Sequence, residues 1–167
     1  NGRIGRLVAN LLLKESRRLD LPPLYLAGYL ESHRDEYNER LQGVREKAEI
    51  QEWICFFLAA ITSQAEDGVW RARRLVDLRQ EYLKEAYKTR SNLPQLVELL
   101  FRNPYVTVRN VERSTGLTNQ GARNLIRRAE DRGWVQSIGT RGRGGREYWV
   151  ALVIYRVIEA PMQYEEK

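Results

Sequence analysis

Six residues at the beginning of the chain have the types and spacing that could hold a phosphate group: Asn1-Gly2-Arg3-Ile4-Gly5-Arg6. Arg3 and Arg6 lie one helical turn apart, so both guanidinium groups can point at one anion. Apolar residues at three- and four-residue spacing continue to Leu12 and predict a helix over residues 2–14. A glycine-rich turn leading into a helix N-terminus is a common phosphate-binding arrangement. The alternative is an ordinary exposed helix start.

A second group of polar and basic side chains lies on a helix predicted to follow Thr118, its N-cap, and to end at Gly133. Apolar residues occupy one face of this helix, so five others point outward: Asn119, Gln120, Arg123, Asn124 and Arg127. These residue types read base edges and phosphates in the major groove of duplex DNA. Three arginines at the tip of a following hairpin could reach the adjacent backbone or minor groove: Arg141, Arg143 and Arg146.

The charge distribution supports a nucleic-acid interface. The net charge is +6, and the segment from Arg109 to Arg146 holds nine arginines but only three acids. A local basic surface of this kind suits nucleic acid, although a solvated basic face is the alternative. The same segment also suits a protein-docking or dimerisation role, since a fold does not fix a function.

Other kinds of site have little support. The single histidine, His33, lies in a charged segment and is expected on the surface, and the single cysteine, Cys55, is expected to be a buried thiol of a cytoplasmic protein. One His and one Cys cannot complete a zinc site of the usual ligand count, so we expect no metal site in the chain. The apolar run Trp53–Ile61 is shorter than the ~20 residues of a membrane span, so no membrane partner is expected.

The periodicity predicts a mainly helical first half. Helices are expected over 24–32, 34–47 and 50–88, the last being about 58 Å long at 1.5 Å per residue. Gly68 is the expected place for a bend. A helix of that length is expected to bridge two domains or to pack against another chain, which makes a homodimer through it an open alternative.

The second half has the pattern of a winged helix, in which three helices precede a β-hairpin. The first helix begins near Ser91-Asn92-Leu93-Pro94, and the second runs from its cap Thr107 to Gly116. The third helix is the one that follows Thr118, and the expected strands are Trp134–Ile138 and Glu147–Leu152. Residues 161–167 are expected to form a frayed tail.

The first half of the chain resembles the Fic family. Asn1-Gly2-Arg3-x-x-Arg6 is similar to the second half of the family motif, His-x-Phe-x-Asp/Glu-Gly-Asn-Gly-Arg/Lys-x-x-Arg. Four later stretches also resemble the family: Leu21-Pro22-Pro23-Leu24-Tyr25-Leu26, Glu31-Ser32-His33-Arg34-Asp35-Glu36-Tyr37, Leu41-Gln42-Gly43-Val44-Arg45-Glu46 and Trp53-Ile54-Cys55-Phe56-Phe57-Leu58. The resemblance implies a mainly α protein divided as the C-terminal part of an all-helical Fic domain (1–66), a connecting helix (67–90), a winged helix (91–160) and the tail (161–167).

By this resemblance, the parent protein is an adenylyltransferase that moves AMP from ATP, with Mg²⁺, to a Ser, Thr or Tyr hydroxyl of a target protein. Asn1 and Gly2 would contact the nucleotide phosphates, Arg3 would support them, and Arg6 would clamp the distal phosphate. Tyr37 and Asn38 fall where the family often carries a Tyr-Tyr pair near the nucleotide; Asn38 departs from that pair, and core packing is the alternative for Tyr37.

The resemblance also implies that the catalytic His and the metal-binding acid precede Asn1, so this chain alone is expected to be inactive. The nearest match to the family's inhibitory motif is Thr62-x-x-x-Glu66, but Asp67 follows it in place of Gly or Asn. The inhibitory Glu is therefore expected to precede Asn1 as well. Two alternatives stay open: a DNA-binding transcriptional regulator or autoregulator that acts through the winged helix, and a dimerisation or target-docking module.

Overall fold

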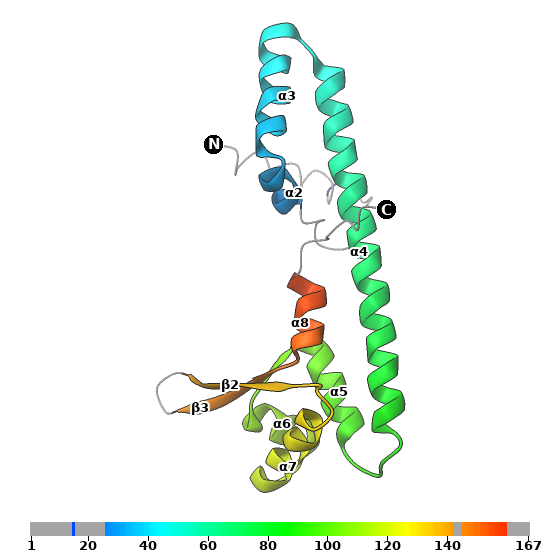
Figure 1. Ribbon diagram of the computed structural model, residues 1–167, viewed down its shortest axis with the longest axis vertical. Coiled ribbons are helices and arrows are strands. Elements are labelled where there is room, and N and C mark those ends of the chain that lie inside the picture. The colour runs from blue at the N-terminus through cyan, green and yellow to red at the C-terminus, as the bar shows by residue number, and fades with distance from the viewer. Residues whose placement is uncertain (1–14, 16–25, 142–144, 160–167) are drawn as a thin grey trace. The chain divides into compact units, whose positions relative to one another are not determined.

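The computed structural model describes residue 15, residues 26–141 and residues 145–159. The predicted helix over 2–14 and the tail 161–167 lie outside these ranges. Within them the chain forms seven helices and one three-stranded antiparallel sheet, which confirms the mainly α fold (Figure 1). None of the described helices is both long enough and apolar enough to cross a membrane. The chain divides into two compact units, Asn1–Trp70 and Arg71–Lys167.

The first unit contains α2 (Leu26–Ser32), α3 (Arg34–Lys47) and the beginning of α4 (Ile50–Ala86). These bounds agree with the predicted helices to within two residues. A tight turn joins α3 to α4, and Ala48 ends α3 in the left-handed conformation, with φ of 57°. The Ala48 N–H donates to the Gly43 carbonyl, so this carbonyl in the last turn of α3 has a hydrogen-bond partner.

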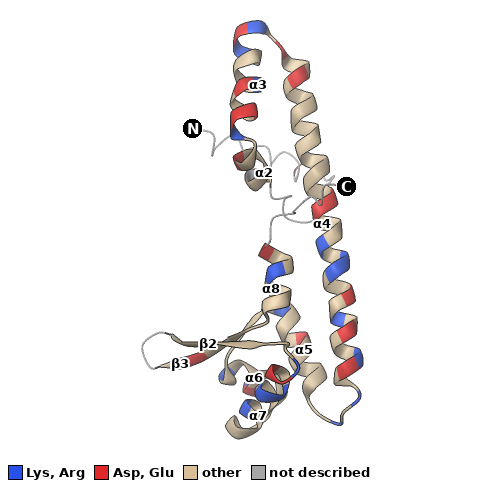
Figure 2. Ribbon diagram, in the orientation of Figure 1, with Lys and Arg blue, Asp and Glu red and all other residues tan. Residues whose placement is uncertain are grey.

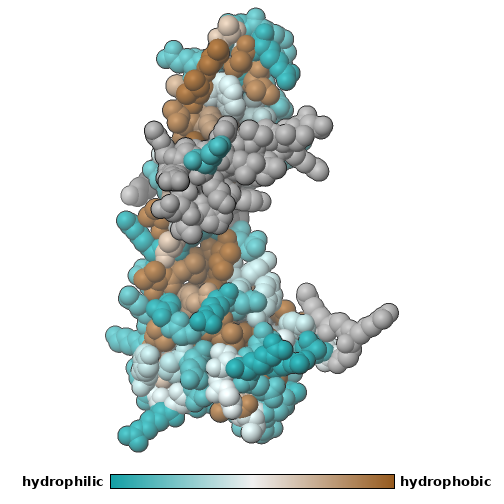
Figure 3. Space-filling view, turned by 180° about the vertical axis from the view of Figure 1, so that it is seen from behind, coloured by the Kyte–Doolittle hydropathy of each residue, from teal (hydrophilic) through white to brown (hydrophobic). Residues whose placement is uncertain are grey.

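Helix α4 is unbroken through Gly68, where a bend had been expected. The part of α4 in the first unit buries Phe56 and Ala60. Its neighbouring face leaves apolar side chains about half exposed: Ile50, Ile54, Leu58 and Val69. Hydrophobic surface is visible at the α3–α4 end of the molecule (Figure 3).

Cys55 is exposed, so the expected buried thiol was wrong. The reason is its place on the helix, because successive residues are rotated by ~100° and Phe56 takes the buried position. The apolar neighbours of Cys55 in the sequence therefore do not predict its burial. His33 is exposed, as expected.

The second unit combines the end of α4 with α5 (Leu93–Arg102), α6 (Val108–Thr115) and α7 (Asn119–Glu130). Leu78, Tyr82 and Ala86 of α4 are buried in the same core as the apolar faces of these three helices. The Tyr82 ring stacks on the Trp134 ring, with 4.8 Å between centroids. Residues 71–86 of the predicted connecting helix are therefore part of the packed C-terminal unit.

The sheet contains β1 (Tyr105–Val106), β2 (Gln136–Arg141) and β3 (Arg146–Val150), in the order β1-β3-β2. The hairpin was predicted, but β2 begins two residues later than expected and β1 was not predicted. Trp134 and Val135 are consecutive and both buried. In a strand with one exposed face, buried and exposed side chains alternate, so these two residues do not fit such a strand. β1 has only two residues, which are too few to show an alternating pattern in the sequence. It also depends on a distant partner, because Val106 pairs with Trp149.

The last described helix, α8 (Leu152–Glu159), was not predicted; its first residue was assigned to the second strand. The segment is rich in β-branched residues, which favour strands, but Ile154 and Val157 lie one helical turn apart and are both buried. The Arg71 Nη1 atom donates to the carbonyl oxygens of Val157 and Ile158, at 2.9 and 2.6 Å. Tertiary contacts therefore override the local strand preference.

Candidate functional site

Two capped helices position the candidate DNA-reading residues. The Thr107 hydroxyl caps α6 by accepting from the Asn110 N–H, and Gly116 ends this helix in the left-handed conformation, with φ of 70°. The Thr118 hydroxyl caps α7 by accepting from the Gly121 N–H at 3.3 Å. Both caps, and the glycine that ends α6, lie where the sequence predicted these helix boundaries.

Helix α7 has one buried and one exposed face. Its buried residues are Ala122, Leu125, Ile126 and Ala129. The five predicted outward residues are all exposed: Asn119, Gln120, Arg123, Asn124 and Arg127. The predicted orientation of the helix is therefore confirmed, and an unbroken row of hydrogen-bonding side chains faces solvent.

Arg123 is held in place by two neighbours. Its Nε–H donates to Asn119 Oδ1 at 3.1 Å, one turn earlier on α7. Its Nη1 lies 3.7 Å from Glu147 Oε2 on β3. Gln120 and Asn124 are joined in a similar way, since Gln120 Nε2 donates to Asn124 Oδ1 at 3.1 Å. These contacts order the polar face of α7 before any ligand is present.

An open hollow of about 420 Å³ lies between this face and the hairpin. Residues of α6, α7 and the hairpin line it: Val108, Arg109, Glu112, Asn119, Arg123, Thr140, Gly145, Arg146 and Glu147. Three arginines and two glutamates are present, so the hollow is basic overall. Arg109, Glu112 and Glu147 were missed from the sequence, and the register that places Glu147 opposite Thr140 is set only in the folded hairpin.

The basic surface is smaller than the arginine count suggests. Arg132 lies over the Trp134 ring at 5.7 Å and donates to the Arg128 carbonyl, so it stabilises the fold. Arg127 and Arg146 are exposed, and neither has an ion-pair partner within the described residues. Figure 2 shows basic residues on α7. Of these two arginines, Arg146 lines the hollow and Arg127 lies on α7.

The side chain of Arg141 and the whole of Arg143 lie outside the described residues. The predicted phosphate-binding residues also lie outside them: Asn1, Gly2, Arg3 and Arg6.

Tyr37 and Asn38, the two other predicted nucleotide contacts, lie on α3. The partly buried Tyr37 ring packs edge-on against Trp53 at 5.8 Å and near Phe56 at 6.4 Å, whereas Asn38 is exposed. These contacts favour the packing role for Tyr37.

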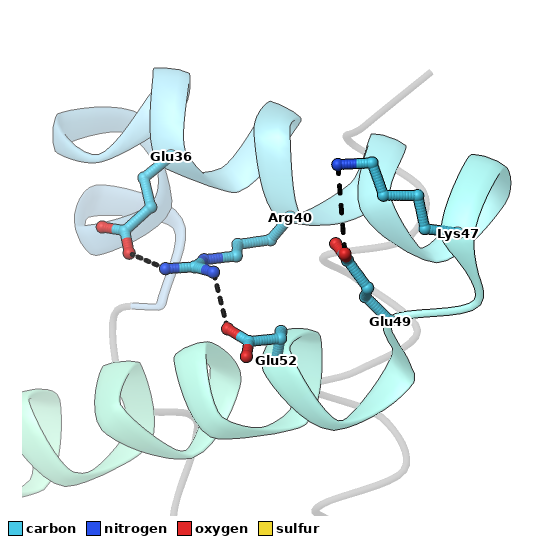
Figure 4. Close-up of polar contacts among 5 residues, drawn as sticks. All are labelled: Glu36, Arg40, Lys47, Glu49 and Glu52. Carbon is cyan, nitrogen blue, oxygen red and sulfur yellow. Dashed lines mark hydrogen bonds and ion pairs between the residues drawn. The ribbon is translucent and has the colours of Figure 1, made fainter.

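An ion pair between Arg40 and Glu52 joins α3 to α4 (Figure 4). Arg40 Nη1 lies 2.7 Å from Glu52 Oε2 on α4, and its Nη2 lies 3.6 Å from Glu36 Oε1. Arg40 therefore bridges the two helices.

No protein-family model matches the chain. In the part of the chain that the structure describes, no three His, Cys, Asp or Glu side chains are grouped closely enough to hold a metal ion.

Proposed function

We propose that the C-terminal unit is a winged helix that binds duplex DNA, with α7 in the major groove and the β2–β3 hairpin as the wing. The order α5, β1, α6, α7, β2 and β3, with β1 beside β3, supports this assignment. The exposed row of Asn, Gln and Arg side chains on α7 is the observation that carries the proposal.

The electrostatics also support duplex DNA as the ligand. Arg127 and Arg146 are available to phosphates, and Arg146 lines the hollow together with Arg109 and Arg123. Each arginine that replaces a counterion on DNA adds to the affinity and to its dependence on salt. Asn119, Gln120 and Asn124 supply the uncharged donors and acceptors that distinguish bases.

Binding of the full chain to labelled duplex DNA tests the proposal. We expect affinity to fall steeply as salt rises, and the double variant Arg127→Gln/Arg146→Gln to lower the salt slope by about two. The matched control is Arg34→Gln/Arg45→Gln, which removes two exposed arginines from α3 and should change neither quantity. Absence of binding even at low salt would rule the function out.

We also propose that the chain is part of a Fic-type protein adenylyltransferase, to which the winged helix is an accessory. The observation that favours this second function is the Asn1-Gly2-Arg3-x-x-Arg6 motif with the ordered similarities that follow it. The motif supplies anion-binding groups, and ATP with Mg²⁺ is the cofactor pair that the family resemblance implies. The target is a protein with an accessible hydroxyl side chain.

The residues that precede Asn1 in the source protein test the second function. We expect His-x-Phe-x-Asp/Glu-Gly there, and transfer of label from α-labelled ATP to a protein hydroxyl when that segment is included. Arg6→Gln should weaken the transfer, whereas Arg17→Gln should not. A different sequence before Asn1 would contradict the assignment.

A further inference from the structure

Glu147 is an acidic residue within a basic DNA-binding surface. It lies on β3, lines the hollow and places its carboxylate 3.7 Å from Arg123. The side chain is partly exposed, and its ion pair is with Arg123, which is itself exposed. Beside a duplex it would meet phosphates of its own charge, which opposes binding.

The geometry at Arg123 shows what the carboxylate can contribute. Asn119 accepts from the Nε–H on one side of the guanidinium, and Glu147 lies near Nη1. A guanidinium has five N–H groups, so three of them, on Nη1 and Nη2, stay available beside these two contacts. Those are the groups that bind the O6 and N7 atoms of guanine in a bidentate arrangement.

The same contact disfavours binding to phosphate alone. An arginine without an acidic neighbour attracts any phosphate, and this attraction supplies most of non-specific affinity. Glu147 offsets part of the Arg123 charge and repels a phosphate that approaches the same place. A guanine edge carries no net charge, so the Glu147 carboxylate repels it less than it repels a phosphate.

We propose that Glu147 is a positioning and specificity-determining residue: it orients Arg123 toward a base edge and weakens binding to DNA of unrelated sequence. This inference rests on the proposed DNA-binding function. It predicts that removing the carboxylate strengthens binding and reduces discrimination, which is opposite to the effect of removing an arginine.

The test compares the full chain with Glu147→Gln on two duplexes, one of random sequence and one selected by the wild type from a random pool. We expect Glu147→Gln to bind the random duplex about three- to tenfold more tightly at low salt, with a slope of log K against log salt steeper by about 0.9. The ratio of the affinity for the selected duplex to that for the random duplex should fall by up to about tenfold, since the random duplex gains more. Glu39→Gln, which removes an exposed carboxylate from α3, should match the wild type.

The outcomes separate this inference from the function on which it rests. If the wild type binds DNA but Glu147→Gln shows the wild-type slope and ratio, the role of Glu147 is overturned while DNA binding stands. If neither protein binds duplex DNA at low salt, both proposals are overturned. A gain of affinity by Glu39→Gln equal to that of Glu147→Gln would reduce the effect to net charge and also contradict the specific role.

Discussion

Arg146 tests how single residues of the wing contribute to binding. It is exposed, lines the hollow and has no ion-pair partner in the described part of the chain, so its guanidinium is available to a phosphate. A phosphate contact carries no sequence information. We expect Arg146→Gln to weaken binding to all duplexes by a similar factor and to reduce the salt slope by about one.

Salt titrations on several duplex sequences measure this effect. Arg156→Gln is the matched control, because Arg156 is exposed in the same unit but lies on α8. A loss confined to one sequence would show that Arg146 reads a base instead.

Tyr82 gives the C-terminal unit a defined response to alkaline pH. Burial raises the pKa of Tyr82 above its ordinary value of 10.0, and the neighbouring Glu81 raises it further, whereas Arg74 lowers it. Because the folded pKa is raised, the neutral phenol is favoured in the folded state. Its contribution to stability is complete below pH 10 and is lost as the pH rises through the folded pKa.

We therefore expect Tyr82→Phe to unfold at the same denaturant concentration as the wild type near pH 7 and at a higher one above pH 10. Urea unfolding followed by Trp fluorescence measures both, since Tyr82 stacks on Trp134. Parallel loss of stability in both proteins above pH 10 would show that Tyr82 does not cause the alkaline transition.

Residue types and spacing predicted the polar face of α7 but not its acidic neighbour. The five outward residues follow from a period of 3.6 and one cap, both local properties of the sequence. Glu147 lies on another element, and its contact with Arg123 depends on how the hairpin packs beside α7. Cys55 shows the same limit, because one position along α4 decides burial.

At the scale of elements, local signals predicted the helices that have a clear apolar period or a cap, and missed β1 and α8, which depend on packing. Thr107, Gly116 and Thr118 mark the ends of α6 and α7 in the sequence and in the structure. β1 exists because Val106 pairs with Trp149, and α8 exists because its apolar residues enter a core built by other segments. The two partners of each of these contacts lie too far apart in the sequence for a short segment to show the contact.

The turn between α3 and α4 carries a strain that a substitution can relieve. Ala48 has a φ of 57°, where its Cβ crowds the backbone and glycine has no such cost. We expect Ala48→Gly to stabilise the first unit by about 1 kcal/mol. Ala59→Gly, at an exposed position inside α4, should destabilise it by about 1 kcal/mol. Chemical unfolding of both variants measures the two changes in the free energy of unfolding. A loss of stability from Ala48→Gly would contradict the strain at this residue.

At the scale of the whole molecule, the sequence leaves open a homodimer through the long helix, and we expect α4 to form it. Residues 50–70 hold three acids and no base, whereas residues 71–86 hold five bases and three acids. Two antiparallel α4 helices would therefore place an acidic segment beside a basic one. The exposed side chains of Ile50, Ile54 and Leu58 provide apolar surface for such a contact.

We expect sedimentation velocity to show a dimer that forms between low micromolar and near-millimolar concentrations. Ile54→Glu/Leu58→Glu should remove it, because two buried carboxylates without partners oppose the contact. Ala59→Glu is the control, since it adds a carboxylate at an exposed position on another face of α4 and should leave the dimer intact. A wild type that sediments as a monomer throughout this range would show that the apolar face serves another purpose. A dimer that survives the double substitution would place the contact elsewhere, and the winged helix would then be the next surface to change.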